Sequence, residues 1–344
     1  MERLRLELIW CAQLLSRNPQ ALQSSAARAY AAVLQRNAHT APPAPLPLDE
    51  IDVADFDRAS FDAVHACRRP VVIRRAFADA PFVGNWSLEH FRRRFGQTDV
   101  LVHEKATQGE RLNGRRAVET TFASFVDGLN AGTDARYMVA STALFAQDRS
   151  LIDDIPLQQL AERFGVQVTR AEMFIGNSNH WSPFHSAWNE NFFVQVEGNK
   201  HWKFVSPDQS AFMYPDYGFA SGPNAVQTAF DARHPERFPL YQLPQQYFTV
   251  LQPGDLLYNP PYWWHEVTNL NASIGMPLRV QPRESLRSPF YLISKMQILS
   301  GLRDATWRGI YRDILSDKLH RRALKETTMN DDPIRVSYPT DTPG

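Results

Sequence analysis

Hydrophobic residues near the N-terminus recur with the spacing of a helix. A stripe through residues 4–15 is followed, after a break at Asn18-Pro19, by a second stripe of the same period. Residues 1–40 therefore predict a helical segment. The Pro-rich stretch at 41–50 cannot continue a helix and predicts an extended linker.

The spacing then changes to that of strands. From residue 51 to about 170 short strands alternate with short helices, and from about 172 to 282 the period of two dominates, broken by Gly, Pro and Asn. Two turns, Gly198-Asn199 and Pro253-Gly254-Asp255, each lie between alternating runs and predict β-hairpins. Residues 51–282 therefore predict one mostly β domain.

Helical spacing returns after this domain. Leucine, methionine and aromatic residues recur every three to four positions through residues 283–327, which predicts C-terminal helices. Residues 328–344 are polar with little to pack and predict a loose tail. The fold class is thus mostly β with flanking helices.

Composition excludes several classes of partner. The chain has 344 residues, 43% of them hydrophobic, which is enough for one large core. Lys+Arg and Asp+Glu balance at 37 each, so no basic field favours nucleic acid or a membrane surface. No apolar run approaches the ~20 residues of a membrane span, and the short run after residue 8 does not resemble a signal peptide. Two cysteines are too few for a disulfide framework, and we expect a cytoplasmic protein.

Two segments carry residues typical of a metal site. The first runs from Trp181 through His185 to Lys200, and the second from Pro253 through Trp263-Trp264-His265. On a strand, residues two apart point to the same face about 6.5 Å from each other. A His-x-carboxylate pair and a distant histidine can therefore bind one metal and leave three positions open.

Together these segments resemble the cupin-like branch of the Jumonji-C superfamily of Fe(II), 2-oxoglutarate-dependent oxygenases. Upstream, residues 69–73 and 85–88 also look like the family, so the resemblance covers most of residues 50–282. It implies a double-stranded β-helix, the cupin or Jumonji-C jelly roll, with N-terminal and C-terminal helical additions. It also implies Fe(II), 2-oxoglutarate and O2 as cofactors, with His185 and His265 as metal ligands.

The resemblance assigns the co-substrate as well. Lys200 falls where the family's lysine pairs with the distal carboxylate of 2-oxoglutarate. Ser182, Asn191 and Tyr137 fall where relatives place further hydrogen bonds to it. His180 and His201 match no family ligand and are interpreted as structural. In relatives the terminal helices dimerise, which suggests a homodimer through the C-terminal helices.

One position departs from the family. Where relatives have the ligand Asp, this chain has Ala187, which has no atom that binds iron. Glu190 lies five residues after His185, an odd offset that predicts the opposite face of a continuing strand. The Fe(II), 2-oxoglutarate-dependent halogenases, mostly from a different branch of the superfamily, replace the same Asp with Ala or Gly, and chloride or bromide takes the vacated place. By analogy of site, Ala187 predicts a halide position, with Trp188 beside it as a substrate contact.

Three functions follow from this departure. The favoured one is a halogenase that acts on an unactivated C–H bond of a small molecule or peptide. The second is a hydroxylase whose metal site is completed by water or a remote carboxylate. The third is a metal-free binding module, a pseudoenzyme.

Overall fold

The computed structural model describes most of the predicted β domain and one N-terminal helix. It covers residues 8–9, 23–37, 41–103, 117–132, 136–166, 168–178, 180–187, 190–216, 225–228, 236 and 238–280. The predicted C-terminal helices and tail, most of the first N-terminal helix, and Trp188 lie outside these residues. No helix in the described ranges is long and apolar enough to cross a membrane.

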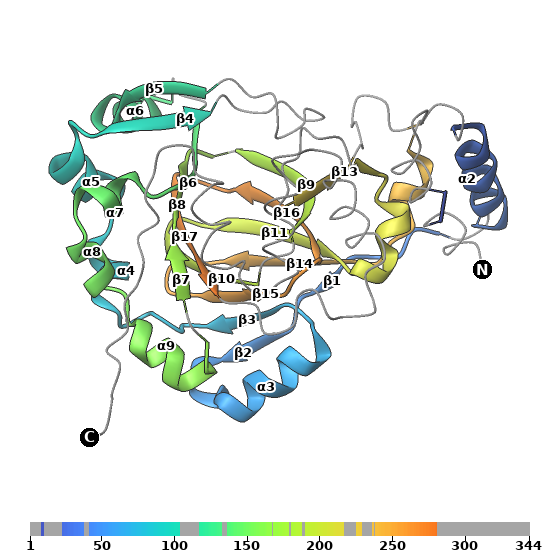
Figure 1. Cartoon of the computed structure of the whole chain (residues 1–344), viewed down its shortest axis with the longest axis horizontal. Coiled ribbons are helices and arrows are strands. Elements are labelled where there is room, and N and C mark those ends of the chain that lie inside the picture. The colour runs from blue at the N-terminus through green and yellow to red at the C-terminus, as the bar shows by residue number, and fades with distance from the viewer. Residues whose placement is uncertain are drawn as a thin grey trace, which may run out of the picture.

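Two β-sheets form the body of the domain (Figure 1). The sheet that we call sheet A has the strand order β1 (Leu46–Pro47), β14 (Gln246–Leu251), β11 (Lys200–Val205), β16 (Trp264–Asn269), β9 (Trp181–Ala187), β13 (Ala225–Thr228) and β12 (Pro215–Asp216). Sheet B has the order β2 (Glu50–Asp52), β3 (Val71–Arg74), β15 (Leu256–Asn259), β10 (Asn191–Glu197), β17 (Ser273–Val280), β8 (Met173–Gly176), β6 (Tyr137–Ser141), β4 (Asp99–His103) and β5 (Ala117–Thr121), with β7 (Val168–Ala171) also pairing with β17.

The predicted strands are present, but the two predicted hairpins are wrong. β10 pairs with β15 and β17 in sheet B, whereas β11, directly after it in the chain, pairs with β14 and β16 in sheet A. The turn at Gly198, with a φ of +70°, therefore carries the chain from one sheet to the other. The turn at Gly254 does the same between β14 and β15. This crossing pattern is that of a double-stranded β-helix, or jelly roll, and confirms the predicted fold class.

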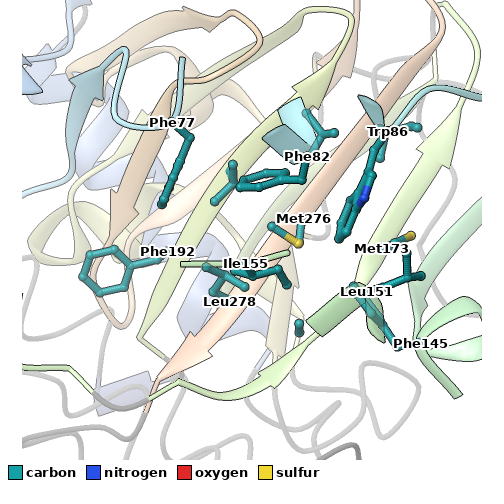
Figure 2. Packing of buried hydrophobic residues seen from close by; sticks show 14 of the residues in the cluster. Phe77, Phe82, Trp86, Phe145, Leu151, Ile155, Met173, Phe192, Met276 and Leu278 are labelled. Carbon is teal, nitrogen blue, oxygen red and sulfur yellow. The ribbon is translucent and has the colours of Figure 1, made fainter. Parts of the chain in front are cut away.

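Helices cover the outer face of sheet B. They are α3 (Arg58–Cys67), α4 (Pro81–Asn85), α5 (Leu88–Phe95), α6 (Phe122–Asn130), α7 (Ala143–Gln147), α8 (Ser150–Asp153) and α9 (Leu157–Phe164), preceded by the 3-10 turn η2 (Val53–Asp55). Their apolar faces and every second residue of the central strands form the largest hydrophobic cluster. Figure 2 shows part of this cluster, including Phe82 and Trp86 from the α4 region and Met276 and Leu278 of β17.

The N-terminal helix packs at the other end of the molecule (Figure 1). α2 (Gln23–Asn37) contacts the 3-10 segment η6 (Pro239–Gln242), and Tyr30 stacks on Tyr214 with ring centroids 4.8 Å apart. A further 3-10 segment, η3 (Pro207–Phe212), follows β11. The Pro-rich segment is extended, and its residues Leu46–Pro47 add the edge strand β1 in parallel to β14.

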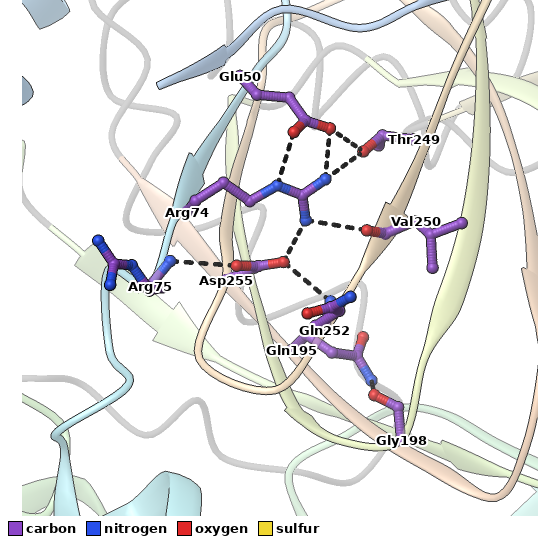
Figure 3. Close-up of polar contacts among 9 residues, drawn as sticks. All are labelled: Glu50, Arg74, Arg75, Gln195, Gly198, Thr249, Val250, Gln252 and Asp255. Atoms are coloured by element: carbon purple, nitrogen blue, oxygen red, sulfur yellow. Dashed lines mark hydrogen bonds and ion pairs between the residues drawn. The ribbon is translucent and has the colours of Figure 1, made fainter. Parts of the chain in front are cut away.

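An ion-pair network fixes the Pro253-Gly254-Asp255 turn against β3. Arg74 binds both Glu50 and the buried Asp255, and it donates to the carbonyl oxygen of Val250 at 2.9 Å (Figure 3). Asp255 also accepts from the backbone N–H groups of Arg75 and Gln252. The Pro253-Gly254-Asp255 turn, which the sequence predicts, therefore also connects the two sheets at this end through Arg74.

The alternation of β10 shows which side chains face the space between the sheets. Phe192 packs outward against the helix-covered cluster, whereas Phe193 points inward to Trp202 of β11, with ring centroids 4.9 Å apart. Residues that share the parity of Phe193 on β10 and of Trp202 on β11 therefore face the interior. The candidate site is built from these positions.

Candidate active site

The two predicted metal ligands face each other across neighbouring strands. His185 of β9 and His265 of β16 are directly paired in the antiparallel register, and their ring centroids lie 4.1 Å apart. Phe184 and Trp264, the residues before them, point to the opposite face and pack together outside. The strands therefore present both imidazoles to the interior, close enough to bind one ion.

Backbone carbonyl oxygens fix the tautomer of both histidine rings. Nδ1 of His185 lies 2.9 Å from the carbonyl oxygen of Pro183, and Nδ1 of His265 lies 2.9 Å from that of Trp263. Because a carbonyl oxygen only accepts, each Nδ1 carries the proton and each Nε2 keeps a lone pair for a metal. Burial, and after it the nearby His185, lowers the pKa of His265 well below its ordinary value, and Arg279 acts in the same direction. His265 is thus neutral at pH 7, as a metal ligand must be.

No protein carboxylate joins these histidines within the described part of the chain. Ala187 shares the interior face of β9 with His185 but offers only a methyl group. Glu190 is buried on the outer face of sheet B, where it accepts a hydrogen bond from the Tyr258 hydroxyl at 2.7 Å. Among the described residues no group of three or more His, Cys, Asp or Glu side chains could hold a metal ion. The site therefore supplies two nitrogen ligands and an open position.

Lys200 lies farther along the same interior, fully buried. Its ammonium donates to Oδ1 of Asn269 at 2.5 Å, and it lies 3.4 Å from the hydroxyl of Tyr137. Burial lowers the pKa of Lys200 to about 7. His180 stacks on the Tyr137 ring with centroids 3.6 Å apart. We call these four residues the Lys200 cluster. The contacts described for the Lys200 ammonium include no carboxylate, so it is suited to bind one from a ligand.

Close approach of the opposite sheet requires glycine beside Lys200. A Cβ atom at Gly275 of β17 would lie 2.2 Å from the Phe193 ring and 2.9 Å from Cε of Lys200. Any larger residue at this position would push the lysine stem aside.

Several polar atoms on the interior faces are buried without a hydrogen-bond partner in the described structure. They are Oδ1 of Asn191, Oδ1 of Asn259, Nδ2 of Asn269 and Nε1 of Trp202. Each such atom costs about 1–3 kcal/mol when nothing satisfies it, and native proteins hold few of them. Their grouping around His265 and Lys200 fits a polar ligand between the sheets, as 2-oxoglutarate with a metal ion would be.

The other predicted co-substrate residues reach the same interior. Tyr137 lies beside the Lys200 ammonium, and Asn191 occupies an interior position of β10 opposite Asn259. Ser182 shares the face of His185 although the offset of three is odd. On β16, His265 and Val267 are two residues apart and share a face. Their partners on β9, His185 and Ser182, are three residues apart, so β9 has one extra residue here, which is a β-bulge.

Sequence reasoning missed several interior residues. His180, interpreted as structural, belongs to the Lys200 cluster, and Asn269, whose place in the register directly opposes Lys200, was not singled out. Arg170 and Arg279 were missed too; both form ion pairs with the buried carboxylate of Glu172. Side chains alternate between the two faces of a strand, and Asn269 lies four residues after His265 on β16. The alternation would therefore have predicted that Asn269 faces the interior with His265.

A double-stranded β-helix that places a histidine pair and a buried lysine between its two sheets is a cupin-type fold. Comparison with known families agrees, because the model of the cupin-like domain family matches residues 57–280. The chain belongs to this cupin-like family.

Several curated proteins are similar to parts of this chain, and one of them is named for a Jumonji C domain. Lysine-specific demethylase 8 of Xenopus tropicalis is 25% identical over 214 residues, which are 61% of this chain and 47% of that protein. Jumonji C domain-containing protein 5 of Drosophila melanogaster is 32% identical over 150 residues, 42% of this chain and 37% of that protein. The human bifunctional peptidase and (3S)-lysyl hydroxylase JMJD7 is 24% identical over 266 residues, 68% of this chain and 84% of that protein. The chain thus spans about half or less of the first two relatives.

Proposed function

We propose that the chain is an Fe(II), 2-oxoglutarate-dependent oxidoreductase whose metal site is completed by an anion from solution. The membership in the cupin-like family and the Jumonji-C relatives support the Fe(II), 2-oxoglutarate and O2 chemistry. The buried Lys200 supports a co-substrate with a distal carboxylate. When bound, the metal and 2-oxoglutarate would supply the oxidising power that removes hydrogen from a C–H bond.

The finer proposal is halogenation, and one observation carries it. Ala187 lies on the interior face two residues from His185, and no described carboxylate stands in for the missing ligand. A halide at this position would restore the negative charge that a ligand Asp provides. The balanced reaction converts R–H, halide, 2-oxoglutarate, O2 and one proton into R–halide, succinate, CO2 and water.

The chain's own residues have separate tasks in this proposal. Nε2 of His185 and Nε2 of His265 hold the metal, and their carbonyl-bound Nδ1 atoms fix the ring orientation. Lys200 and Asn269 hold the distal end of the co-substrate. The substrate proposed is a small molecule or peptide with an unactivated C–H bond.

Hydroxylation is the second candidate, and the name of one relative favours it, since that protein is named a (3S)-lysyl hydroxylase. Water would then fill the position beside Ala187, and the product would carry oxygen. The two candidates share the metal and the co-substrate, and they differ in whether a halide or water occupies the position beside Ala187.

An anaerobic titration tests both candidates. Fe(II) and 2-oxoglutarate are added to the full chain with and without chloride, and the visible charge-transfer band of the chelate is recorded. We expect a band that chloride shifts, that His185→Ala removes, and that His201→Ala leaves unchanged because His201 lies outside the interior. No band and no retained iron would refute both enzymatic proposals and leave a binding module. A band indifferent to chloride, followed by products that carry oxygen alone once O2 and a substrate are admitted, would refute halogenation and support hydroxylation.

A further inference from the structure

The described contacts of the buried Lys200 side chain are all with neutral groups. Its nitrogen lies 2.5 Å from Oδ1 of Asn269, 3.4 Å from the Tyr137 hydroxyl and 5.6 Å from the centre of the Tyr137 ring. The opposite strand closes over the stem, since a Cβ atom at Gly275 would lie 2.9 Å from Cε of Lys200. The side chain is therefore shut off from water, and its described contacts supply no negative charge.

The other titratable groups near Lys200 belong to the sheet B side of the interior. Tyr137 lies on β6, the His180 ring stacks on it with centroids 3.6 Å apart, and His103 of β4 is paired with Tyr137 in the register. The two strands paired with β11 and the strand that faces it contribute residues without a titratable group: Leu251 of β14, Asn269 of β16 and Gly275 of β17. None of these described groups is a carboxylate that could offset a charge on Lys200.

A lysine in this position loses its proton far more readily than a lysine in water. The ammonium form has been removed from water without a described carboxylate to compensate it, whereas the neutral amine still donates hydrogen bonds to Asn269 and Tyr137. Burial accordingly lowers the pKa of Lys200 to about 7. At pH 8 most molecules without a bound co-substrate therefore hold a neutral lysine.

The proposed co-substrate would reverse this balance. 2-Oxoglutarate is a dianion from pH 6 to pH 9, because carboxylic acids of this kind ionise at about pH 4. Its distal carboxylate would bring a negative charge to the Lys200 nitrogen. The Nδ2 atom of Asn269, which is buried without a hydrogen-bond partner in the described structure, would donate to the same carboxylate. An opposite charge this close in a buried site strongly favours the ammonium form.

From this arrangement we infer that 2-oxoglutarate binds together with one proton, which the Lys200 amine takes up from solvent as it pairs with the distal carboxylate. The proton stays on Nζ, and no bond to carbon forms or breaks. The inference rests on the proposed function, since the ligand is its co-substrate. It makes the affinity for the co-substrate depend on pH, with tight binding below neutral pH and progressively weaker binding above it.

Linkage between binding and protonation gives the size of the effect. Because the lysine of the unliganded protein is half protonated at about pH 7, each 2-oxoglutarate should take up about half a proton at pH 7 and about 0.9 at pH 8. The apparent Kd should rise only about twofold from pH 6 to pH 7 and about fiftyfold from pH 7 to pH 9.

Isothermal titration calorimetry in buffers of different ionisation enthalpy, such as phosphate and Tris, counts these protons. 2-Oxoglutarate is added to the full chain in a chelator, and again after anaerobic loading with Fe(II). Lys200→Arg keeps its charge over the whole range, because a guanidinium does not lose its proton. It should bind 2-oxoglutarate without proton uptake and with equal affinity at pH 7 and pH 9. Lys203→Met, which removes an outward-facing lysine of the same strand, should keep the wild-type uptake.

A second measurement covers the case in which Lys200→Arg does not fold. With carbon-13 in the lysine side chains, the Cε resonance that is missing from Lys200→Met identifies Lys200. At pH 8 it should move from the position of a neutral amine to that of an ammonium when 2-oxoglutarate is added, and an unmoved resonance would contradict the inference.

Three results of the calorimetry would overturn the inference. They are wild-type binding without proton uptake at pH 8, undiminished uptake in Lys200→Arg, and loss of the uptake in His180→Asn with binding retained, which would assign the proton to the histidine. The charge-transfer band reports on the metal end of the complex and is measured separately. A band together with pH-independent binding would refute this inference alone, whereas no band and no binding would refute the proposed function as well.

Discussion

Replacing the buried lysine by an isosteric apolar residue should stabilise the protein and abolish co-substrate binding. The pKa of Lys200 falls from its ordinary 10.5 to about 7 because the side chain is fully buried. At about 1.36 kcal/mol for each pH unit, burial disfavours the charged form by about 5 kcal/mol at or below pH 7. Lys200→Met removes this cost. It also leaves Oδ1 of Asn269 without its donor, at a cost of about 1–3 kcal/mol, so we expect a net gain of about 2–4 kcal/mol at pH 7.

The pH dependence of stability gives a second signature. The unfolded chain holds the Lys200 proton up to about pH 10.5, whereas the folded protein holds it only up to about pH 7. The unfolded state therefore binds more protons between these values, and the stability of the wild type rises with pH across this window. Below pH 7 the full cost is present. Lys200→Met lacks the ionisable group, so its advantage over the wild type should shrink steadily from pH 7 to pH 10.

Urea unfolding of both proteins at pH 6, 7, 8 and 9, with and without 2-oxoglutarate, measures these effects. The co-substrate should stabilise the wild type and leave Lys200→Met unchanged, since stabilisation follows from binding to the folded state. Lys203→Met is the matched control. Lys203 points outward and pairs with Glu266 at 2.8 Å, so its loss should lower stability and preserve 2-oxoglutarate binding. A Lys200→Met variant that is less stable than the wild type at pH 7, or that still binds 2-oxoglutarate, would refute the reasoning.

Three further changes test neighbouring parts of the molecule. Ala187→Asp should close the proposed halide position and convert the proposed halogenation to hydroxylation, as product mass spectrometry would show; unchanged chlorination contradicts the proposed third ligand. Gly275→Val should weaken 2-oxoglutarate binding at least tenfold by calorimetry, because its side chain would displace the Lys200 stem; wild-type affinity would show that the sheets can part. Arg74→Met should lower the free energy of unfolding by about 3–5 kcal/mol, since Asp255 would stay buried without its partner; a loss under 1 kcal/mol in urea would show that backbone N–H groups suffice.

The strands were predictable because their inward and outward residues alternate over long runs. The pairing was not, because the turns at Gly198 and Gly254 look locally like hairpin turns. Their partners lie far away in the sequence: β10 joins β17 about eighty positions later. Pairing of this kind depends on burying both faces of the strands, and the local pattern carries no information about it.

The site was predictable where a motif marked it. His185, His265 and Lys200 face the interior as the family pattern implies. Glu190 lies on the outer face, but its odd offset from His185 is not the reason, because β9 ends at Ala187 and Glu190 directly precedes β10 of the other sheet. The same parity rule fails for Ser182, because a β-bulge adds one residue before His185. Arg170 and Arg279 had no motif to reveal them, since a strand arginine is usually a solvated surface residue.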